Sequence, residues 1–489
     1  MCGIVAYTGD KQAFDFLIKG LQRLEYRGYD SAGIALLNGE LNVYKQKGKV
    51  LDLLEETKGK NIDGTTGMGH TRWATHGEPN QINAHPHVSQ SGNIAVIHNG
   101  IIENFATLKE ALMKNGHTFK SDTDTEVLIH LIEDIQQHEN VDLFEAVRLA
   151  LNEVVGAYAI VIISKNDPGT IIGARKGSPL VIGIGKGNKE YYMASDATPI
   201  VEYTRDVIYL DDNEIAQIKD SELTIKTIQN VVKTPYIHKL EVTLEAIEKG
   251  GYEHFMLKEI YEQPKSIYDS MRGRFNPTDL TFAMRSLHEY ESKIKNLKRI
   301  IIVGCGTSWH AGLVAEYIIE EFGRLPVEVE YASEFRYRDP IISEDDMVIA
   351  ISQSGETADT LAALELAKEK GATIYGICNV VGSSIPRMTD AGAYTHAGPE
   401  IGVASTKAFT AQVTVLVLIA LGIADIRGTI KKDRLRQIFA ELEALPGKVK
   451  KVLESCSDKV LEIAKRYKDV DHFLYLGRGV NFPVALEGA

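Results

Sequence analysis

Hydrophobic positions form short runs between polar and glycine positions in the first half of the chain. Up to residue 235, brief apolar runs are punctuated by Gly and Asn, a pattern typical of β-strands. Such runs occupy residues 2–9, 31–39, 93–100, 157–164, 170–177, 191–196 and 214–220. Residues 12–28 and 123–137 instead carry apolar side chains at helical spacing. The pattern predicts an α+β domain with stacked, mainly antiparallel sheets.

The pattern changes from Arg299 onward, where apolar strands alternate with helices. Strand-like runs occupy residues 299–304, 327–331, 347–352 and 372–378, and helices are expected from Ser308 and Asp359. This order is typical of βαβ units and predicts a parallel sheet covered by helices. A charged, helical connector is expected over 236–296. A long apolar helix from Thr406 and a charged helix near 431–452 follow.

The end of the chain repeats the start of this second pattern. Residues 299–315 and 472–489 both have a strand-like run, a Gly-x-Gly and the start of a helix, with Gly304 and Gly306 matching Gly477 and Gly479. The second copy stops within its first helix, so we expect a C-terminally truncated repeat. The predicted domains are an α+β domain at 1–238, a helical connector at 239–285, an α/β domain at 286–430 and an incomplete second α/β domain at 455–489.

Charge, hydropathy and cysteine usage exclude several classes of protein. The 54 Lys and Arg against 67 Asp and Glu give a net charge of −13, which disfavours a nucleic acid partner. The longest apolar stretch, 413–424, is shorter than the ~20 residues that span a bilayer, so a buried helix and no membrane are expected. The N-terminus does not resemble a signal peptide. Four scattered cysteines without a CxxC predict a reduced, cytoplasmic setting.

Cys2 is the first candidate for chemistry. A small residue after the initiator favours removal of Met1, which would make Cys2 the N-terminus. A terminal cysteine joins a thiol to an α-amine whose pKa is about 7.7–8.0, so the amine serves as general base near neutral pH. From position alone, Cys2 fits equally a small apolar residue of an edge strand.

Four polar motifs favour the catalytic interpretation. Residues 24–33 contain Arg27, 69–80 contain Arg72, Trp73, Thr75 and His76, 98–104 contain Asn99 and Gly100, and 121–126 contain Asp124. Asn99 and Gly100 offer a side-chain and a backbone N–H, which is what an oxyanion hole requires. Arg72 suits a carboxylate and Asp124 an ammonium group. The set is therefore expected to grip an α-amino acid while Cys2 attacks its side-chain carbonyl.

These motifs resemble the N-terminal-nucleophile (Ntn) glutaminase domain of the class II amidotransferases. The resemblance covers about residues 1–235 and implies that Cys2 forms a γ-glutamyl thioester from L-glutamine and releases ammonia. It implies that Asn99 and Gly100 form the oxyanion hole and that Arg27 supports the site. It also implies that Trp73 gates an ammonia passage. The residues that it places on glutamine are Arg72, Thr75, His76 and Asp124.

The first half also contains a cluster of histidines, His70, His76, His85, His87 and His98. No set of carboxylates or thiolates with zinc spacing accompanies them. Structural or substrate-contacting histidines are therefore expected. The sequence predicts no metal and no other cofactor.

In the second half, hydroxyl side chains follow two of the expected strands. Ser352, Gln353, Ser354 and Thr357 lie at a helix N-terminus, where backbone N–H groups and the helix dipole favour an anion such as phosphate. Ordinary N-capping is the alternative. No Walker pattern is present, so a nucleoside triphosphate is not expected.

Two further segments of the second half carry glycine and hydroxyl residues ahead of an expected helix. Gly304 and Gly306 precede Thr307 and Ser308, and Trp309 occupies the place of the third Gly of a dinucleotide fingerprint. Val403, Ser405 and Thr406 precede the long apolar helix. Lys407 fits either a phosphate or carboxylate partner or a solvated lysine.

These segments resemble the sugar isomerase (SIS) domain. Together with the glutaminase they resemble the glutamine–fructose-6-phosphate aminotransferase family, whose connector matches 249–264. The resemblance implies a homodimer that passes ammonia to fructose 6-phosphate, giving glucosamine 6-phosphate and glutamate. It places Ser352, Gln353, Ser354 and Thr357 on the phosphate, and Thr307, Ser308, Val403 and Ser405 along the sugar.

One departure from the family concerns the end of the chain. The family's lysine and glutamate that act on the open-chain sugar follow the segment 485–489. Glu487 lies before that position and is not assigned as the isomerisation base. The sequence therefore predicts transfer of ammonia to the sugar phosphate, with glutaminase activity alone as the alternative.

The sequence also suggests two other functions. A phosphoribosylpyrophosphate amidotransferase would need an Asp-Asp loop after an apolar strand, whereas Asp345 and Asp346 precede the strand. A non-catalytic SIS-type sensor of sugar phosphates would not need the Cys2 constellation.

Overall fold

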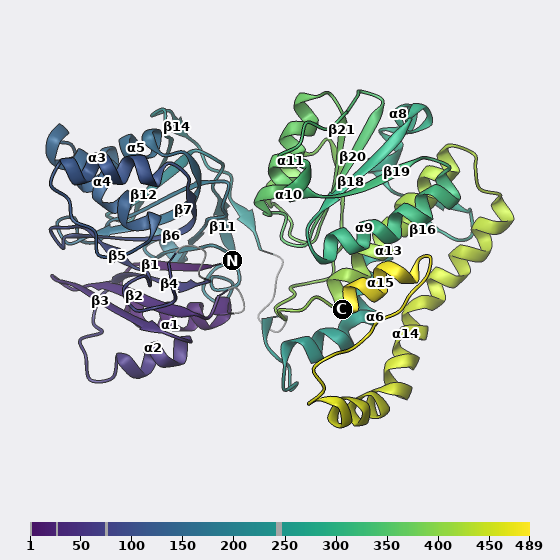
Figure 1. Ribbon diagram of the computed structural model, residues 1–489, viewed down its shortest axis with the longest axis horizontal. Helices are drawn as coiled ribbons and strands as arrows, with labels where there is room; N and C mark the ends of the chain where they lie inside the picture. The colour runs from purple at the N-terminus through teal and green to yellow at the C-terminus, as the bar shows by residue number, and fades with distance from the viewer. Residues whose placement is uncertain (1, 26–27, 74–76, 241–246) are drawn as a thin grey trace. The chain divides into compact units, whose positions relative to one another are not determined.

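The computed structural model describes residues 2–25, 28–73, 77–240 and 247–489. The chain divides into two compact units, Met1–Leu244 and Glu245–Ala489, which are described separately (Figure 1).

Unit 1 contains two large antiparallel sheets. The first has the strand order β15-β11-β9-β10-β1-β4-β2-β3 and the second β14-β13-β12-β8-β7-β6-β5. The strands of the first sheet are β1 (Gly3–Thr8), β2 (Ser31–Leu37), β3 (Leu41–Lys47), β4 (Thr66–Arg72), β9 (Val181–Ile184), β10 (Tyr191–Ala194), β11 (Asp206–Tyr209) and β15 (His238–Lys239). Those of the second are β5 (His87–Val88), β6 (Ile94–Ile102), β7 (Gly156–Ser164), β8 (Ile171–Lys176), β12 (Glu214–Lys219), β13 (Glu222–Thr227) and β14 (Val232–Lys233).

The two sheets pack face to face because alternate residues of each strand point to opposite faces. On β6, Ala95 and Ile97 join Ile4 and Met68 of the first sheet in one core. Ile94 and Val96 of β6 face the helices instead, in a second core. The prediction of stacked, mainly antiparallel sheets is confirmed.

Helices cover both outer faces of this sandwich (Figure 1). α1 (Ala13–Leu24) packs on β1 and β4, and α2 (Val50–Glu56) packs on β2 and β3. On the other side, α4 (Asp124–Glu139) packs on β6 and lies between α3 (Phe105–Lys114) and α5 (Leu143–Glu153). A short 3-10 turn, η2, spans Lys186–Asn188. The result is a four-layer α-β-β-α arrangement.

Unit 2 is built on a five-stranded sheet with the order β19-β18-β20-β21-β22, in which all neighbours are parallel. Its strands are β18 (Arg299–Gly304), β19 (Val327–Tyr331), β20 (Asp346–Ser352), β21 (Thr373–Cys378) and β22 (Ala391–Tyr394). Ile300 and Ile302 of β18 face one core, whereas Ile301 and Val303 face the other. Helices therefore cover both faces, as the βαβ pattern predicts.

The helices of unit 2 include three that surround the sheet's carboxyl edge, α9 (Thr307–Ile318), α11 (Ala358–Glu369) and α13 (Lys407–Ile426). The others are α6 (Phe255–Met271), α7 (Arg285–His288), α8 (Glu291–Asn296), α10 (Ala332–Phe335), α12 (Ser384–Met388), α14 (Lys432–Tyr467) and α15 (Asn481–Gly488). A π turn, η4 (Ile319–Gly323), continues α9, and a small hairpin joins β16 (Phe275–Asn276) to β17 (Thr281–Phe282).

α13 is long and apolar enough, by length and composition, to cross a membrane. Two-thirds of its apolar window (67%) is nevertheless buried inside unit 2, where it packs against α6 and α9. The helix therefore forms part of the core, as the sequence predicts.

The expected strand at 472–477 does not form. Residues 472–478 have no regular structure, and Leu474 and Leu476 are each 82% exposed. A strand needs a hydrogen-bonded neighbour, and none of the sheets of the described residues extends to this segment. The turn after it does lead into a helix, α15, as the repeat predicts.

Candidate active sites

Cys2 lies at the start of β1, in the middle of the first sheet of unit 1. Gly3 of β1 pairs with Thr71 of β4, so the antiparallel register places Cys2 beside Arg72 and Trp73. The backbone N–H of Trp73 donates to Cys2 Sγ across 3.3 Å. The thiol is thus held in place by the strand end that carries the polar motif at 69–80.

The environment of Cys2 keeps its thiol protonated. Burial raises the pKa of Cys2 above its ordinary value, although the N–H of Trp73 and the positive charge of Arg72 act in the opposite direction. A protonated thiol is a weak nucleophile and needs a base. An α-amine on Cys2 itself, which the sequence predicts after removal of Met1, is such a base; residue 1 lies outside the described residues.

Asn99 and Gly100 reach the nucleophile from the second sheet. Asn99 Nδ2 donates to the Cys2 carbonyl oxygen across 3.0 Å. Gly100 has φ +132°, and a Cβ there would lie 2.0 Å from the carbonyl oxygen of Ala157 on β7. Glycine is therefore required at this position. The structure brings together the three residues that the sequence singles out for catalysis.

His70 is a contact that the motifs did not indicate. Its Nε2 lies 2.9 Å from Asn99 Oδ1 and 3.1 Å from the carbonyl oxygen of His98. Both partners are acceptors, so Nε2 carries the proton and Nδ1 carries the lone pair. Burial lowers the pKa of His70 to about 3, so the ring is neutral. A neutral ring with one defined tautomer fixes which way the Asn99 amide faces.

The remaining described histidines of the cluster are structural. His85 stacks on His70 with ring centroids 4.2 Å apart. His98 Nδ1 lies 3.0 Å from Thr125 Oγ1, and His87 Nε2 lies 3.1 Å from Thr123 Oγ1. Strands β5 and β6 are thereby joined to the start of α4.

Arg72 and Asp124, the two residues expected to hold an α-amino acid, are both buried. Arg72 Nη2 donates to the carbonyl oxygen of Gly77 across 3.4 Å. Asp124 opens α4, and its Oδ2 accepts the N–H of Ile102 across 2.8 Å. Asp124 is therefore attached to the strand that carries Asn99 and Gly100.

Trp73 is half-exposed, and its ring meets Tyr29 edge-on at 5.3 Å. The other three predicted site residues of this unit, Arg27, Thr75 and His76, lie outside the described residues.

In unit 2, the candidate site lies where the strand order reverses. β18 is flanked by β19 on one side and by β20 on the other, and the chain continues outward from β20 to β21 and β22. Ligands of open parallel sheets bind at this reversal, beyond the carboxyl ends of the strands. The turns that follow β18 and β20 are those of Gly304–Thr307 and Ser352–Thr357. Two of the predicted sugar-phosphate motifs therefore meet there.

In the turn after β20, the hydroxyl groups bond to one another and to the backbone of the turn itself. Ser352 Oγ accepts the N–H of Gly355 and lies 3.0 Å from Thr357 Oγ1. Thr357 occupies the N-cap position of α11 but makes no side-chain cap bond. Gly355 has φ +69°, and a Cβ there would lie 1.9 Å from Ser383 Oγ. Glu356 accepts both the N–H and the hydroxyl of Ser384 at 2.8 Å, which attaches the turn to α12.

The Thr357 side chain therefore does not cap α11, and phosphate binding at this turn stays a prediction. Gln353 and Ser354, the two other predicted phosphate residues, are partly exposed in it.

The turn after β18 brings in a residue that sequence analysis left unassigned. Thr307 Oγ1 donates to Glu487 across 2.6 Å, and His310 Nδ1 lies 2.5 Å from the same carboxylate. Ser308 is buried, and its hydroxyl accepts from Gln412 Nε2 of α13 at 3.1 Å. Glu487 is 180 residues from Thr307 in the chain, which is why no local motif reveals the contact.

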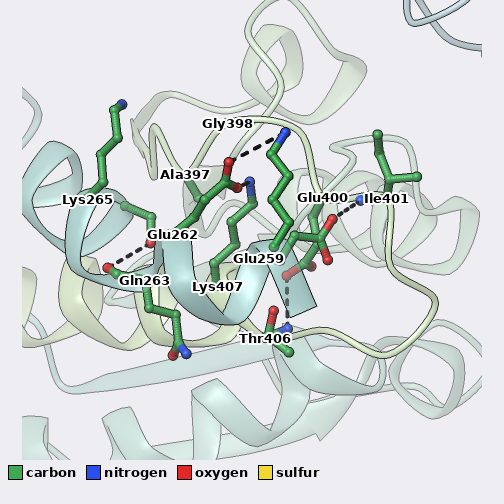
Figure 2. Close-up of polar contacts among 12 residues, drawn as sticks. Glu259, Glu262, Gln263, Lys265, Ala397, Gly398, Glu400, Ile401, Thr406 and Lys407 are labelled. Carbon is green, nitrogen blue, oxygen red and sulfur yellow. Dashed lines mark hydrogen bonds and ion pairs between the residues drawn. The ribbon is translucent and has the colours of Figure 1, made fainter. Parts of the chain in front are cut away.

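The third predicted segment of the sugar-phosphate site leads into α13. Val403 is 77% exposed, and Ser405 Oγ donates to Glu400 at 2.9 Å. Lys407 is only 3% exposed and pairs with Glu262 of α6 at 2.6 Å (Figure 2). Lys407 is thus not a solvated lysine, because burial next to a carboxylate requires the ion pair.

Three side chains of unit 1 carry donor atoms of the kind that bind metals. Among the described residues, His117, His130 and Glu133 place one donor atom each within 4.8 Å of one another. Donor atoms in a tetrahedral zinc site lie about 3.4 Å apart, given bonds of ~2.0–2.1 Å. The Glu133 oxygens already accept the N–H groups of Gln90 and Ser91. The group is therefore too wide and too occupied to be assigned a metal.

Comparisons with known proteins match the first and second halves of the chain to two different family models. A family model described as a glutamine amidotransferase domain matches residues 55–254, and one described as a SIS domain matches residues 293–422. The glutamine–fructose-6-phosphate aminotransferase [isomerizing] of Bacteroides thetaiotaomicron is 60% identical over 492 residues, which cover 100% of this chain and 80% of that protein. The protein of the same name from Chlorobaculum tepidum is 56% identical over 496 residues, with the same coverage. The chain belongs to the glutamine–fructose-6-phosphate aminotransferase family.

A solved structure of this aminotransferase family also resembles the chain. The C-terminal domain of the glucosamine-fructose-6-phosphate aminotransferase from Francisella tularensis is 39% identical, with a TM-score of 0.47. It covers 50% of this chain, and the match covers 67% of that structure.

Two residues that contact the candidate sites, His70 and Glu487, could not be identified from the sequence. His70 contacts Asn99 directly, and Glu487 contacts Thr307. The first was visible only as one of several clustered histidines. The second had no visible partner, because it depends on packing between α15 and α9.

Proposed function

We propose that this chain transfers ammonia from L-glutamine to fructose 6-phosphate, giving glucosamine 6-phosphate and glutamate. The observation that carries the glutaminase half is the contact of Asn99 Nδ2 with Cys2, at 3.0 Å, beside a thiol that is kept protonated. A nucleophile and a fixed amide donor on adjacent sheets are the requirements of acyl transfer. The curated relatives carry the same activity in their names.

The glutaminase reaction follows from these positions. The α-amine of Cys2 takes the thiol proton, and the thiolate attacks the side-chain carbonyl carbon of glutamine. The C=O pair moves to oxygen, where Asn99 Nδ2 and the Gly100 N–H stabilise the oxyanion. Collapse breaks the C–N bond, and the protonated amine supplies the proton with which ammonia leaves. Water then hydrolyses the thioester to glutamate and restores the thiol.

Charge complementarity selects an α-amino acid for this reaction. Arg72 takes the α-carboxylate and Asp124 the α-ammonium group, because paired charges in a buried site are worth most when both are satisfied. Thr75 and His76 add further contacts to glutamine, and Arg27 supports them. Trp73 gates the passage of ammonia.

The sugar phosphate binds at the strand reversal of unit 2. Ser352, Gln353, Ser354 and Thr357 take the phosphate, with the N-terminus of α11 beneath them. The sugar is lined by Thr307, Ser308, Val403 and Ser405. Ammonia adds to the C2 carbonyl of the open-chain ketose and water leaves. Transfer of a proton from C1 to C2 then gives the 2-amino aldose, a step that requires a base beside these two carbons.

The domain organisation proposed with this function is a glutaminase at 1–238, a connector at 239–285, a first SIS domain at 286–430 and the beginning of a second at 455–489. The division into compact units at residues 244 and 245 supports the first boundary. We further propose a homodimer in the cytoplasm that acts without nucleic acid or membrane partners.

Product analysis tests the proposal. Purified protein is given L-glutamine with and without fructose 6-phosphate, glutamate is measured, and the sugar product is identified by mass spectrometry. Wild type should release glutamate and form glucosamine 6-phosphate, and Cys2→Ala should form neither. Cys456→Ala, which removes an exposed thiol from α14 of unit 2, is the matched control. Glutamate release without any amino sugar would overturn the synthase half, and no glutamate release would overturn the glutaminase half.

A further inference from the structure

A buried carboxylate joins the connector helix α6 to the polypeptide that precedes α13 (Figure 2). Glu259 of α6 is only 2% exposed. Its Oε1 accepts the backbone N–H of Ile401 at 2.5 Å and that of Gly402 at 3.0 Å. These two N–H groups lie 142 and 143 residues from Glu259 in the chain, so the contact fixes one element against a distant one.

The backbones approach each other closely at this point. A Cβ on Gly402 would lie 2.5 Å from Glu259 Oε2 and 3.2 Å from Cα of Met256. A residue with a Cβ at 402 would displace the Glu259 carboxylate and crowd the backbone of α6. Gly402 therefore serves the contact by allowing close approach.

A second carboxylate holds the other end of the same segment. Glu400 Oε1 accepts the N–H groups of Thr406 and Ala408 at 2.9 and 3.0 Å, while Oε2 accepts the Ser405 hydroxyl. The Lys407–Glu262 pair adds a further bond to α6. Between these anchors the chain turns outward, and Val403 is exposed at its tip. We call residues 401–406 the sugar loop.

The energetic balance makes Glu259 necessary for this geometry. A buried carboxylate is costly unless it is fully hydrogen-bonded, and here two charge-assisted N–H bonds satisfy it. Burial raises the pKa of Glu259, the N–H groups of Ile401 and Gly402 lower it, and the charges of Glu400 and Lys407 act in opposite directions. Truncating the side chain leaves two buried N–H groups without their acceptor, which destabilises this arrangement of the loop.

We propose that Glu259 is a positioning residue of the sugar-phosphate site, which acts by holding the sugar loop through the backbone N–H groups of Ile401 and Gly402. Glu259 does not touch the sugar. It sets the positions of Val403 and Ser405. A residue of the connector therefore affects the affinity of unit 2 for the ketose phosphate. This inference rests on the function proposed above, because it assumes that the sugar loop lines the substrate.

Binding and hydrogen exchange test the inference together. Titration calorimetry with fructose 6-phosphate compares the wild-type chain with Glu259→Ala and Glu259→Gln. Loss of the clamp should weaken binding about tenfold in Glu259→Ala, which corresponds to ~1.4 kcal/mol. Glu259→Gln keeps an acceptor oxygen without the charge and should fall between the two. Glu253→Ala, which removes an exposed carboxylate just before α6, is the matched control and should bind as wild type.

Amide hydrogen exchange gives a readout that a merely structural role would not move. The peptide that contains residues 401 and 402 should exchange faster in Glu259→Ala, with an intermediate rate in Glu259→Gln, while peptides of β18 and β20 remain unchanged. Glutamate release without sugar phosphate should also be unchanged, because Cys2 lies in unit 1.

Two results separate this inference from the proposed function. If wild type binds no fructose 6-phosphate, the proposed sugar site is wrong. If wild type binds the sugar phosphate and both Glu259 variants bind it equally well, the site stands and the inference is overturned. Uniformly faster exchange throughout unit 2 would also overturn it, because Glu259 would then serve only stability. If Glu259→Ala does not fold, the comparison of Glu259→Gln with wild type decides the question.

Discussion

The proton on Nε2 of His70 points at the side-chain oxygen of Asn99, 2.9 Å away. Because that oxygen is held, the amide nitrogen of Asn99 must face the other way, where it donates to the carbonyl of Cys2 at 3.0 Å. An unrestrained amide could rotate by 180° and present an acceptor to the oxyanion. His70 thus converts an ambiguous side chain into a defined donor.

Loss of this contact should impair turnover more than substrate binding. A single oxyanion donor is worth about 10²–10³ in kcat, and His70 controls the orientation of one. We expect His70→Ala to lower kcat for glutamate release by about tenfold to a hundredfold, with KM for glutamine nearly unchanged. His87→Ala removes another buried histidine, whose Nε2 contacts Thr123 rather than the oxyanion hole. Equal losses of kcat in the two variants would show that His70 acts only through packing.

Strands, helices and short motifs depend on residues that are close together in the sequence, and these features are predicted well. The continuous apolar runs of β18 and β20 indicate strands that are buried on both faces of a parallel sheet, and that sheet forms. The motif residues Cys2 and Asn99 were chosen separately, and antiparallel pairing and sheet stacking bring them together.

Side-chain contacts between elements that are far apart in the sequence are predicted poorly. Lys407 has no charged neighbour in sequence that explains its burial, and its partner Glu262 is 145 residues away. Glu259 on the connector looks like an ordinary helical carboxylate until Ile401 is placed against it. The apolar run at 473–476 has strand composition, yet no strand forms without a partner. Such features are set by tertiary packing, which local pattern does not encode.

The protonated state of Cys2 predicts the pH dependence of glutamate release. Because burial raises the pKa of the thiol, little thiolate is present at neutral pH, and the α-amine must take the proton. The rate should therefore rise with pH through the amine pKa of about 7.7–8.0 and level off above it. Steady-state kinetics between pH 6 and 9 measure this profile.

The same reasoning predicts the effect of a blocked N-terminus. A variant with Ala inserted between Met1 and Cys2 keeps the thiol but moves the amine to another residue. It should lose glutamate release while retaining its thermal unfolding midpoint, and mass spectrometry confirms which residue is first. Full activity in this variant would show that a group other than the α-amine is the base.

The buried histidines predict how the stability of unit 1 depends on pH. Burial lowers the pKa of His70 and of His87 to about 3, from an ordinary value of 6.5. Between these values the unfolded chain binds protons that the folded protein does not, so stability falls as the pH falls. The thermal unfolding midpoint should drop progressively from pH 7 toward pH 4. In His87→Gln the drop should be shallower, and an identical slope in the variant would show that His87 does not titrate differently in the folded and unfolded states.

Gly355 provides a test of the turn that is proposed to bind phosphate. A Cβ there would lie 1.9 Å from Ser383 Oγ, in addition to the strain of φ +69°. Gly371 also has a positive φ, of +86°, but a Cβ there meets nothing within 4 Å. Both Ala variants carry backbone strain of about 1 kcal/mol because of the positive φ. Only Gly355→Ala must also displace the turn. We therefore expect Gly355→Ala to weaken fructose 6-phosphate binding about tenfold or more, against less than about twofold in Gly371→Ala. Calorimetric titration of both variants with fructose 6-phosphate measures the difference. Glutamate release checks that unit 1 is intact. Equal affinities would show that the Ser352–Thr357 turn does not belong to the sugar-phosphate site.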